Sequence, residues 1–276
     1  MIAGVAGLGL IGGSLSKAYR GGGHCVYGFD ADEEVLGFAL LSGAASGVLD
    51  KNTIGRCQLI FIALNPADTV DYLEKNAPYI SKDAMVIDCC GVKRLVCSKC
   101  FPIAEKYGFA FVGGHPMAGS HKGGFKNSRE SLFRGASMIL VPPVYDDPVL
   151  FGRMEELLRP AGFGRLTVSS AAKHDEMIAF SSQMAHVVSN AYVKSPTARG
   201  HKAFSAGSYK DLTRVARLNP EMWAQLCIEN RDFLIKELDS FTGEIEKYKE
   251  SLARGDKDTL QELLEEGSRL KGELDP

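Results

Sequence analysis

The chain has 276 residues, enough for about two domains with a sizeable core. Hydrophobic residues make up 45% and charged residues 24%, which is typical of globular proteins and excludes a disordered or fibrous chain. The 32 basic and 34 acidic residues nearly cancel, so bulk charge gives no reason to expect binding to nucleic acid or a membrane surface. The longest aliphatic or aromatic run, residues 59–64, is too short to span a membrane.

The N-terminal residues and the cysteines indicate the compartment. Residues 1–5 carry no basic segment and begin no signal-type apolar stretch, so we expect a cytoplasmic protein. The seven cysteines are odd in number, and a chain of this length does not need disulfides for stability. Both observations agree with a reducing compartment.

Short apolar strands alternate with amphipathic helices in the first 170 residues. We expect strands at residues 2–6, 24–29, 59–64, 85–89, 109–112 and 138–141, a first helix ending near residue 20, and helices at 32–41, 68–77 and 93–107. This alternation predicts a parallel sheet with crossover helices. The same part holds 24 of the 30 glycines and 8 of the 11 prolines, as tight turns between short elements require.

The last hundred residues contain few helix breakers. Apolar periodicity predicts a long helix over residues 171–194, and further helices over 222–238, 242–254 and 258–270. We therefore expect an α/β domain over residues 1–168 and an all-helical domain over residues 169–276.

A glycine-rich turn follows the first predicted strand and opens the first helix. Its G-x-G-x-x-G spacing is typical of a Rossmann dinucleotide-binding domain, where a pyrophosphate meets the helix N-terminus. Asp30, at the end of the next strand, can accept hydrogen bonds from both ribose hydroxyls. Because its carboxylate would repel a 2′-phosphate and no arginine follows directly, we expect NAD rather than NADP. The expected cofactor-binding residues are Gly7, Leu8, Gly9, Leu10, Ile11, Gly12 and Asp30.

His115 stands in a glycine-rich loop, residues 113–121, directly after a predicted strand. Ligands in such folds bind outside the carboxyl ends of the strands, so this loop should border the nicotinamide.

Two polar segments lie in the helical part. His174-Asp175 and His186 share the first long helix, and their twelve-residue separation excludes an i, i+4 metal pair. Lys210 and Arg214 are four residues apart and share a face if this stretch is helical. The guanidinium of an arginine matches a carboxylate.

These segments together resemble the prephenate/arogenate dehydrogenase family of tyrosine biosynthesis. The matching residues, in the family's order, are Gly7 to Ser14, His115-Pro116-Met117-Ala118-Gly119, His174-Asp175, His186, Lys210-Asp211-Leu212-Thr213-Arg214, Asn219-Pro220 and Trp223. The resemblance implies a Rossmann domain, a helical dimerisation domain that makes the chain a homodimer, and a small-molecule site between the two domains.

The resemblance implies an NAD-dependent oxidative decarboxylation of prephenate to 4-hydroxyphenylpyruvate. Neutral His115 is then the acceptor of the substrate hydroxyl proton, because imidazole titrates near physiological pH. Arg214 is the expected partner of the ring carboxylate. His186 and Lys210 are candidates for the second carboxylate, on the pyruvyl side chain.

Some positions depart from the family's pattern. Gly91 stands where the family usually carries a serine that contacts the substrate hydroxyl. Gln183 and Ala185 replace a histidine and a proline, and His121 replaces a glutamate. We expect Gln183 and His121 to remain among the substrate-binding residues, with the reaction class unchanged.

Three alternative functions remain open. Arogenate, which carries an amino group where prephenate has a keto group, is the rival substrate within the family. A 3-hydroxyacid dehydrogenase would use a lysine on the helix that opens the second domain, where Lys173 stands, but would leave His115 unexplained. A nucleotide-sensing protein would have no reason to carry His115 and Arg214. A single C-x-x-C pair, Cys97 and Cys100, is a weak metal signal, and we expect no metal.

Overall fold

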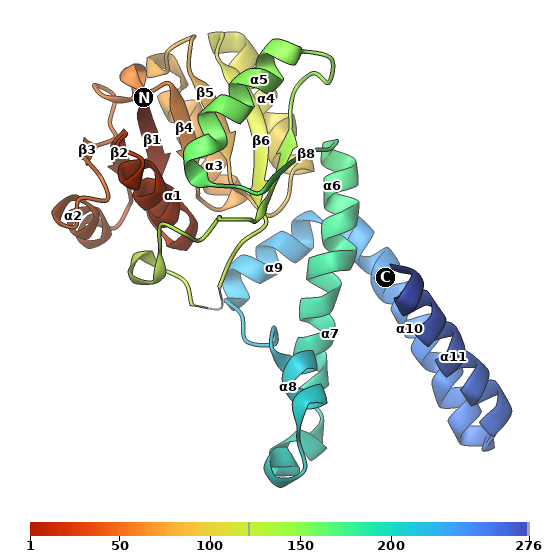
Figure 1. Cartoon of the computed structure of the whole chain (residues 1–276). Helices are drawn as coiled ribbons and strands as arrows, with labels where there is room; N and C mark the ends of the chain where they lie inside the picture. The colour runs from red at the N-terminus through yellow and green to blue at the C-terminus, as the bar shows by residue number, and fades with distance from the viewer. Residues whose placement is uncertain (121, 275–276) are drawn as a thin grey trace.

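The computed structural model describes residues 1–120 and 122–274, and Figure 1 shows a sheet covered by helices beside a second, helical part. The strands are β1 (Ile2–Ala6), β2 (Cys25–Phe29), β3 (Gly47–Val48), β4 (Leu59–Ile62), β5 (Met85–Asp88), β6 (Ala110–Pro116), β7 (Ser137–Val141) and β8 (Arg165–Val168). The helices are α1 (Leu10–Gly21), α2 (Glu33–Leu41), α3 (Pro66–Asn76), α4 (Arg94–Tyr107), α5 (Pro148–Leu158), α6 (Ala171–Ile178), α7 (Ala185–Tyr192), α8 (Gly207–Thr213), α9 (Pro220–Glu229), α10 (Arg231–Arg254) and α11 (Lys257–Leu274).

The eight strands form one sheet in the order β3-β2-β1-β4-β5-β6-β7-β8. The order reverses between β1 and β4, which opens a crevice at the carboxyl ends of the strands, where doubly wound folds bind dinucleotides. All pairs are parallel except β6 with β7, where Gly113 faces Val141. The expectation of a parallel sheet is therefore confirmed from β1 to β6 and wrong at β7.

The reversal at β7 has a local cause. The segment between β6 and β7 contains only a short 3-10 turn, Phe125–Asn127, in its described residues, and no crossover helix. Parallel neighbours need a crossover connection, whereas antiparallel neighbours can be joined by a simple return of the chain. The edge strands β3 and β8 were not expected either, because β3 has only two residues and β8 is not a buried apolar run like β4 and β5.

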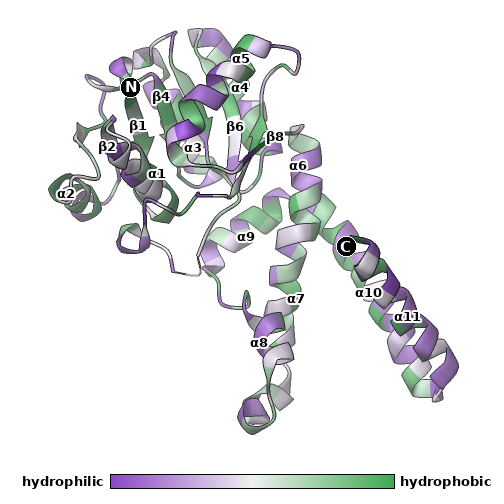
Figure 2. Ribbon diagram, in the orientation of Figure 1, coloured by the Kyte–Doolittle hydropathy of each residue, from purple (hydrophilic) through white to green (hydrophobic). Residues whose placement is uncertain are grey.

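Apolar side chains fill both faces of the sheet, and the strands form the most hydrophobic part of the ribbon in Figure 2. One core holds Leu15 and Tyr19 of α1, and the other holds Leu73 of α3 and Val96 of α4. The buried Tyr19 hydroxyl donates to the carbonyl oxygen of Leu157 at 2.6 Å. A rigid sheet of this kind presents its loops in a fixed geometry.

The helical part begins with a nearly continuous rod. It consists of α6, a π-helical turn over Ala179–Met184, and α7. The sequence predicts a break between two helices at residues 239–241, but the structure is helical there. Asn219 caps α9 through its Oδ1, which accepts from two backbone N–H groups, and the chain breaks at Asn230. Helix α10 then runs unbroken for 24 residues. Gly243 in its interior lowers the helix propensity but does not end the helix.

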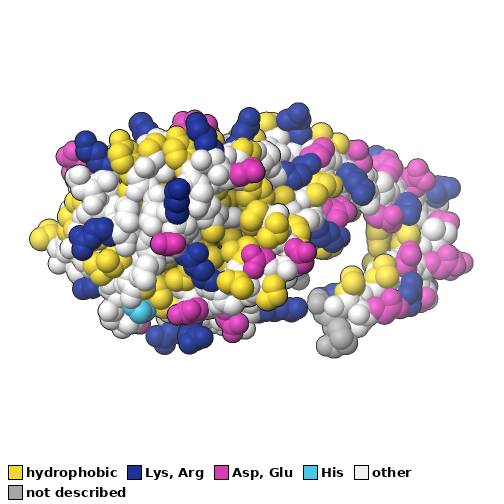
Figure 3. Space-filling view, turned by 90° about the horizontal axis from the view of Figure 1, so that it is seen from above, with side chains coloured by type: hydrophobic (Ala, Val, Ile, Leu, Met, Phe, Trp, Pro, Cys, Tyr) yellow, Lys and Arg dark blue, Asp and Glu magenta, His cyan; other side chains and the backbone are white. Residues whose placement is uncertain are grey.

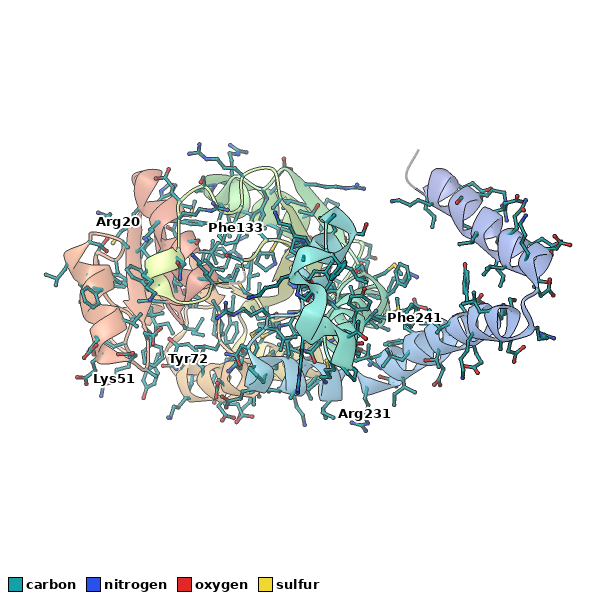
Figure 4. All side chains as sticks on the ribbon, turned by 90° about the horizontal axis from the view of Figure 1, so that it is seen from below. Arg20, Lys51, Tyr72, Phe133, Arg231 and Phe241 are labelled. Carbon is teal, nitrogen blue, oxygen red and sulfur yellow. The ribbon has the colours of Figure 1, made fainter. Side chains whose placement is uncertain are left out.

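The strands run toward the helical part, so their carboxyl ends face α9 and the rod (Figure 1). Seen from below in Figure 4, α10 runs outward from Arg231 past Phe241, and α11 folds back beside it. Tyr248 of α10 joins the pair by donating to the carbonyl oxygen of Leu263 at 3.1 Å. On the upper face in Figure 3, basic side chains are interspersed with acidic and hydrophobic ones.

Within the described ranges, no helix is both long enough and apolar enough to cross a membrane.

Candidate active site

The glycine turn between β1 and α1 leaves open space where a dinucleotide phosphate would lie. Gly7 has a φ of +84°, and a Cβ on Gly12 would lie 1.8 Å from the Gly7 carbonyl oxygen. By contrast, a Cβ on Gly9 would meet no described atom within 4 Å. No side chain of the described residues caps the N–H groups at the start of α1. The turn therefore fits a pyrophosphate bound by backbone N–H groups.

Asp30 lies just after β2 and is hydrogen-bonded to this turn. Its Oδ2 accepts from the backbone N–H of Leu8 at 2.7 Å, and its Oδ1 accepts from that of Asp32 at 3.0 Å. Each carboxylate oxygen keeps a further lone pair for a ribose hydroxyl. The side chains of Leu8, Leu10 and Ile11 pack on the core, so these residues offer a nucleotide their backbone groups. The site therefore fits NAD.

His115 lies near the end of β6, at the same sheet edge as the glycine turn. The preceding Gly114 is held on both sides by a buried ion pair. Its N–H donates to Asp88 Oδ1 at 3.1 Å, and its carbonyl oxygen accepts from Lys93 Nζ at 2.6 Å. Lys93 Nζ also donates to Asp88 Oδ2. The ion pair thus fixes the backbone from which the His115 ring projects.

The His115 ring is half-buried and contacts His174 of α6. His115 Nδ1 lies 2.8 Å from His174 Nε2, and His174 Nδ1 lies 2.7 Å from Asp175 Oδ1. The pKa of His115 is held well below its usual value of 6.5, first by burial and then by the nearby His174 and Lys93. Its form at physiological pH is therefore the neutral imidazole that a general base requires.

Asp175 is buried and accepts hydrogen bonds from the start of α4. Its Oδ1 accepts from the backbone N–H of Lys93 at 2.7 Å, and its Oδ2 accepts from that of Arg94 at 2.9 Å. Burial alone would raise the pKa of Asp175, but hydrogen bonds from His174 and from these two N–H groups lower it. The carboxylate is therefore ionised, and it connects the nucleotide-binding part to α6.

The π-helical turn sets how His174 and His186 lie relative to each other. In a regular α-helix, twelve residues make about three and a third turns, which would place the two rings on different faces. A π turn takes up an extra residue and so rotates His186 back toward the face of His174.

His186 stacks on Trp223 of α9, with 3.8 Å between the ring centroids. Its Nδ1 donates to the carbonyl oxygen of Ser182 at 2.9 Å, which leaves Nε2 as an acceptor in the neutral ring. A hollow of about 400 Å³ between α7 and α9 is lined by both rings and by Lys194. The stacking contact with Trp223 was not anticipated from the sequence, where the two rings lie 37 residues apart.

Lys210 lies on α8, and Arg214 is the first residue after this helix. Both side chains are exposed. Helix α8 is fastened to α7 by Ser189, whose hydroxyl donates to the carbonyl oxygen of Leu212 at 2.7 Å. Neither cation has a hydrogen-bond or ion-pair partner among residues 1–120 and 122–274. Both are therefore available to an anionic ligand, although nothing in the described chain brings them into contact with His115.

Gln183 is buried, which argues against the expectation that it contacts substrate. Its Nε2 donates to the carbonyl oxygen of Leu226 at 3.0 Å, and its Oε1 accepts from Asn230 at 2.8 Å. Its amide thus holds the π turn against α9 and α10. His121, also expected to bind substrate, lies outside the described residues. A Cβ on Gly91 would lie 3.4 Å from Leu226, so α9 covers the position of the family's serine.

The cysteine pair that gives the weak metal signal belongs to α4. Cys97 and Cys100 are buried in the core beneath α4, and burial raises the pKa of Cys97 to about 12. No group of three or more histidine, cysteine or acidic side chains in the described chain could hold a metal ion.

Two family models match consecutive parts of this chain. Residues 14–165 match the nucleotide-binding domain of prephenate dehydrogenase, and residues 170–266 match its dimerization domain. The chain belongs to the prephenate dehydrogenase family. This membership confirms the expected class of fold, a Rossmann-like domain followed by a helical dimerisation domain, and the resemblance from which it was expected.

Relatives in this family carry different substrate names. The chain is 29% identical over 266 residues to a prephenate dehydrogenase of Bacillus subtilis, covering 93% of this chain and 71% of the relative. An arogenate dehydrogenase structure from Synechocystis matches with a TM-score of 0.81 at 27% identity, covering 98% and 99% of the two chains. A prephenate dehydrogenase structure from A. aeolicus, in complex with hydroxyphenyl propionate and NAD+, matches with a TM-score of 0.80 at 26% identity, covering 100% and 98%.

Proposed function

We propose that this chain catalyses the oxidative decarboxylation of prephenate to 4-hydroxyphenylpyruvate, with NAD as the hydride acceptor. The observation that carries the proposal is His115, a neutral imidazole at the carboxyl end of β6 and at the sheet edge that holds the dinucleotide turn. The names of the B. subtilis and A. aeolicus relatives support prephenate as substrate, and the NAD+ in the A. aeolicus structure supports the cofactor.

The reaction requires a base at the C4 hydroxyl of the substrate. NAD, when bound, accepts the hydride that leaves C4. His115 accepts the hydroxyl proton, because loss of hydride from C4 makes the hydroxyl more acidic and the O–H bonding electrons form the carbonyl. The bond between C1 and its carboxylate then breaks, carbon dioxide leaves, and the bonding electrons complete the aromatic ring. The proton returns from His115 to the same oxygen, so the reaction releases no net proton.

The two carboxylates of prephenate require cations. We assign Arg214 to the ring carboxylate, because its planar guanidinium can orient both oxygens. His186 and Lys210 are proposed for the carboxylate on the pyruvyl side chain, and His121 is proposed to line the substrate. Lys210 lies on α8 and Arg214 is the residue after its last one, and both are exposed and unpaired among the described residues, which supports a dianionic ligand.

Arogenate is the second candidate substrate, and the name of the Synechocystis structure favours keeping it. An assay with NAD and either compound, followed at the nicotinamide absorbance, separates the two. We expect turnover with prephenate and a much lower kcat/KM with arogenate. The opposite order would change the substrate, and no turnover with either would refute the proposal.

A 3-hydroxyacid dehydrogenase is less well supported. Lys173, which would have to serve as its catalytic lysine, is exposed and pairs with Glu176 at 2.9 Å. A 3-hydroxyacid assayed with NAD should therefore give no turnover.

We also propose that the chain is a homodimer through its helical part. The dimerization-domain match supports this assembly. Large apolar side chains are exposed on the projecting pair α10–α11, among them Ile235, Ile245, Leu252 and Leu264. A second copy would bury such side chains, and burial of exposed apolar surface stabilises an interface.

A further inference from the structure

His115, His174 and Asp175 form a line of polar groups that runs from the proposed catalytic site into the protein interior. We propose that His174 and Asp175 are a positioning pair that fixes the tautomer of His115, so that its Nε2 carries the free lone pair that receives the substrate proton. The inference rests on the proposed function for the identity of that proton. The tautomer itself is a property of the protein without substrate.

The tautomer of His115 follows from the hydrogen bonds that lead from Asp175 through His174 to His115. An ionised carboxylate can only accept hydrogen bonds, so His174 Nδ1, 2.7 Å from Asp175 Oδ1, carries a proton and donates it. Burial lowers the pKa of His174 by more than its hydrogen bond with Asp175 raises it, so the ring is neutral and its Nε2 is an acceptor. His115 Nδ1, 2.8 Å from this Nε2, therefore carries the proton. The remaining nitrogen of His115, Nε2, must be unprotonated.

The geometry that holds Asp175 is independent of the two histidines. Its two oxygens accept from consecutive backbone N–H groups, those of Lys93 and Arg94, at the N-terminus of α4. Helix N-termini stabilise negative charge, so the carboxylate stays ionised and cannot rotate freely. Asn230 donates to the backbone carbonyl oxygen of Asp175 at 2.8 Å and fixes the same residue from the side of α10.

Other charges around His115 do not replace this pair. Lys93 approaches from the start of α4, but its ammonium is paired with Asp88 of β5 and bonded to the Gly114 carbonyl oxygen. These two groups fix the backbone of β6. The carboxylate of Asp175 is the acidic group that contacts His115 through a hydrogen-bonded partner, so it stabilises the imidazolium that forms when His115 takes up a proton.

The tautomer can be measured on the unliganded protein. Nitrogen-15 NMR of histidine-labelled protein distinguishes protonated from bare ring nitrogens, and the variants H115N and H174F assign the signals. We expect His115 to show a protonated Nδ1 and a bare Nε2 at pH 7.5. A protonated Nε2 on His115 in the natural protein would overturn the inference, whatever the substrate assays show.

Kinetics of the folded variants provide the second test. His174→Phe removes the acceptor, and we expect a loss of kcat of at least ~10-fold, because a catalytic histidine in the wrong tautomer loses much of its activity. His174→Gln can place its amide oxygen near the position of Nε2 and should recover part of that loss. The KM for NAD should stay unchanged in both variants.

Lys173→Met is the matched control, because Lys173 is exposed, adjacent in sequence and on the same helix. It should retain full activity. If His174→Phe folds and keeps kcat within twofold of the natural protein, the pair has no positioning role. If the NMR result holds and neither prephenate nor arogenate turns over, the tautomer assignment stands and the proposed function is wrong.

Discussion

Lys93 and Asp88 form an ion pair in which neither side chain is exposed to solvent. The pair holds Gly114, the residue before His115: Asp88 accepts from the Gly114 N–H, and Lys93 donates to the Gly114 carbonyl oxygen. The pair therefore connects three segments near the proposed site: the end of β5 at Asp88, the start of α4 at Lys93, and β6 at Gly114. Removing one partner would leave a buried charge without compensation.

Lys93→Met should therefore lower the free energy of unfolding by about 3–5 kcal/mol. Lys173→Met, an exposed control, should change it by less than about 0.5 kcal/mol. Urea titration followed by circular dichroism would measure both. Burial alone would lower the pKa of Lys93, but Asp88 raises it above 10.5, so the stabilisation that comes from charging Lys93 is present at pH 10.5 and is lost as the pH rises through the folded pKa. A Lys93→Met variant as stable as the natural protein would contradict this account.

His115 should act in the chemical step. His115→Asn retains hydrogen bonding but cannot accept a proton in the same way, so kcat should fall by ~10²–10⁴-fold with a smaller change in KM. The pKa of His115 in the folded protein lies well below 6.5. Therefore kcat/KM should fall only when the pH drops through this lowered pKa, where the ring takes up a proton. This acidic limb should disappear in the variant. A variant with near-normal kcat would exclude His115 from the mechanism.

Asp30 should determine the choice between NAD and NADP. Its carboxylate lies at the glycine turn and would repel a 2′-phosphate, so NAD should give a much higher kcat/KM than NADP. Asp30→Ser should narrow that gap, because the hydroxyl keeps some hydrogen bonding without the charge. Steady-state kinetics with both cofactors measures the effect. Equal use of the two cofactors by the natural protein would refute this role.

Arg214 should bind the ring carboxylate and have little effect on cofactor binding. Arg214 is exposed in the free protein, but in the substrate complex the bound carboxylate would cover its guanidinium, and losing one partner of such a buried charge pair costs about 2–5 kcal/mol. Arg214→Ala should therefore raise the KM for prephenate by at least ~30-fold, since about 1.4 kcal/mol corresponds to tenfold. Arg214→Lys should recover only part, because lysine lacks the planar guanidinium. If the alanine variant instead weakened NAD binding, the assignment would be wrong.

The assembly can be checked by light scattering. A homodimer should give about twice the 29.9 kDa mass of one chain at micromolar concentration. Charged replacements of Ile245 and Leu252, both exposed on α10, should shift the equilibrium toward monomer if this pair of helices forms the interface. A monomeric natural protein that turns over would refute the homodimer.

Several parts of the site depend on short-range rules and were accessible from the sequence. The turn from Gly7 to Gly12 is one, because a positive φ and a close approach of helix and strand require glycine at fixed positions. Asp30 is another, because it directly follows β2, and the carboxyl ends of parallel strands lie at the same end of the sheet as the glycine turn. His115 was expected at the carboxyl end of its strand, but in a loop that begins at residue 113; the structure instead extends β6 to Pro116, so His115 belongs to the strand.

Other features were decided only by the tertiary structure, because they join segments far apart in the chain. His115 and His174 are 59 residues apart, and the sequence marked both without showing that one holds the other. Gln183 looked like a substrate ligand, yet the packing of α9 and α10 turns its amide inward. The break at Asn230 likewise arises where that side chain bonds to Asp175 and Gln183. Local patterns fix backbone conformation over a few residues, whereas the partners of a buried polar group are fixed only when the whole chain packs.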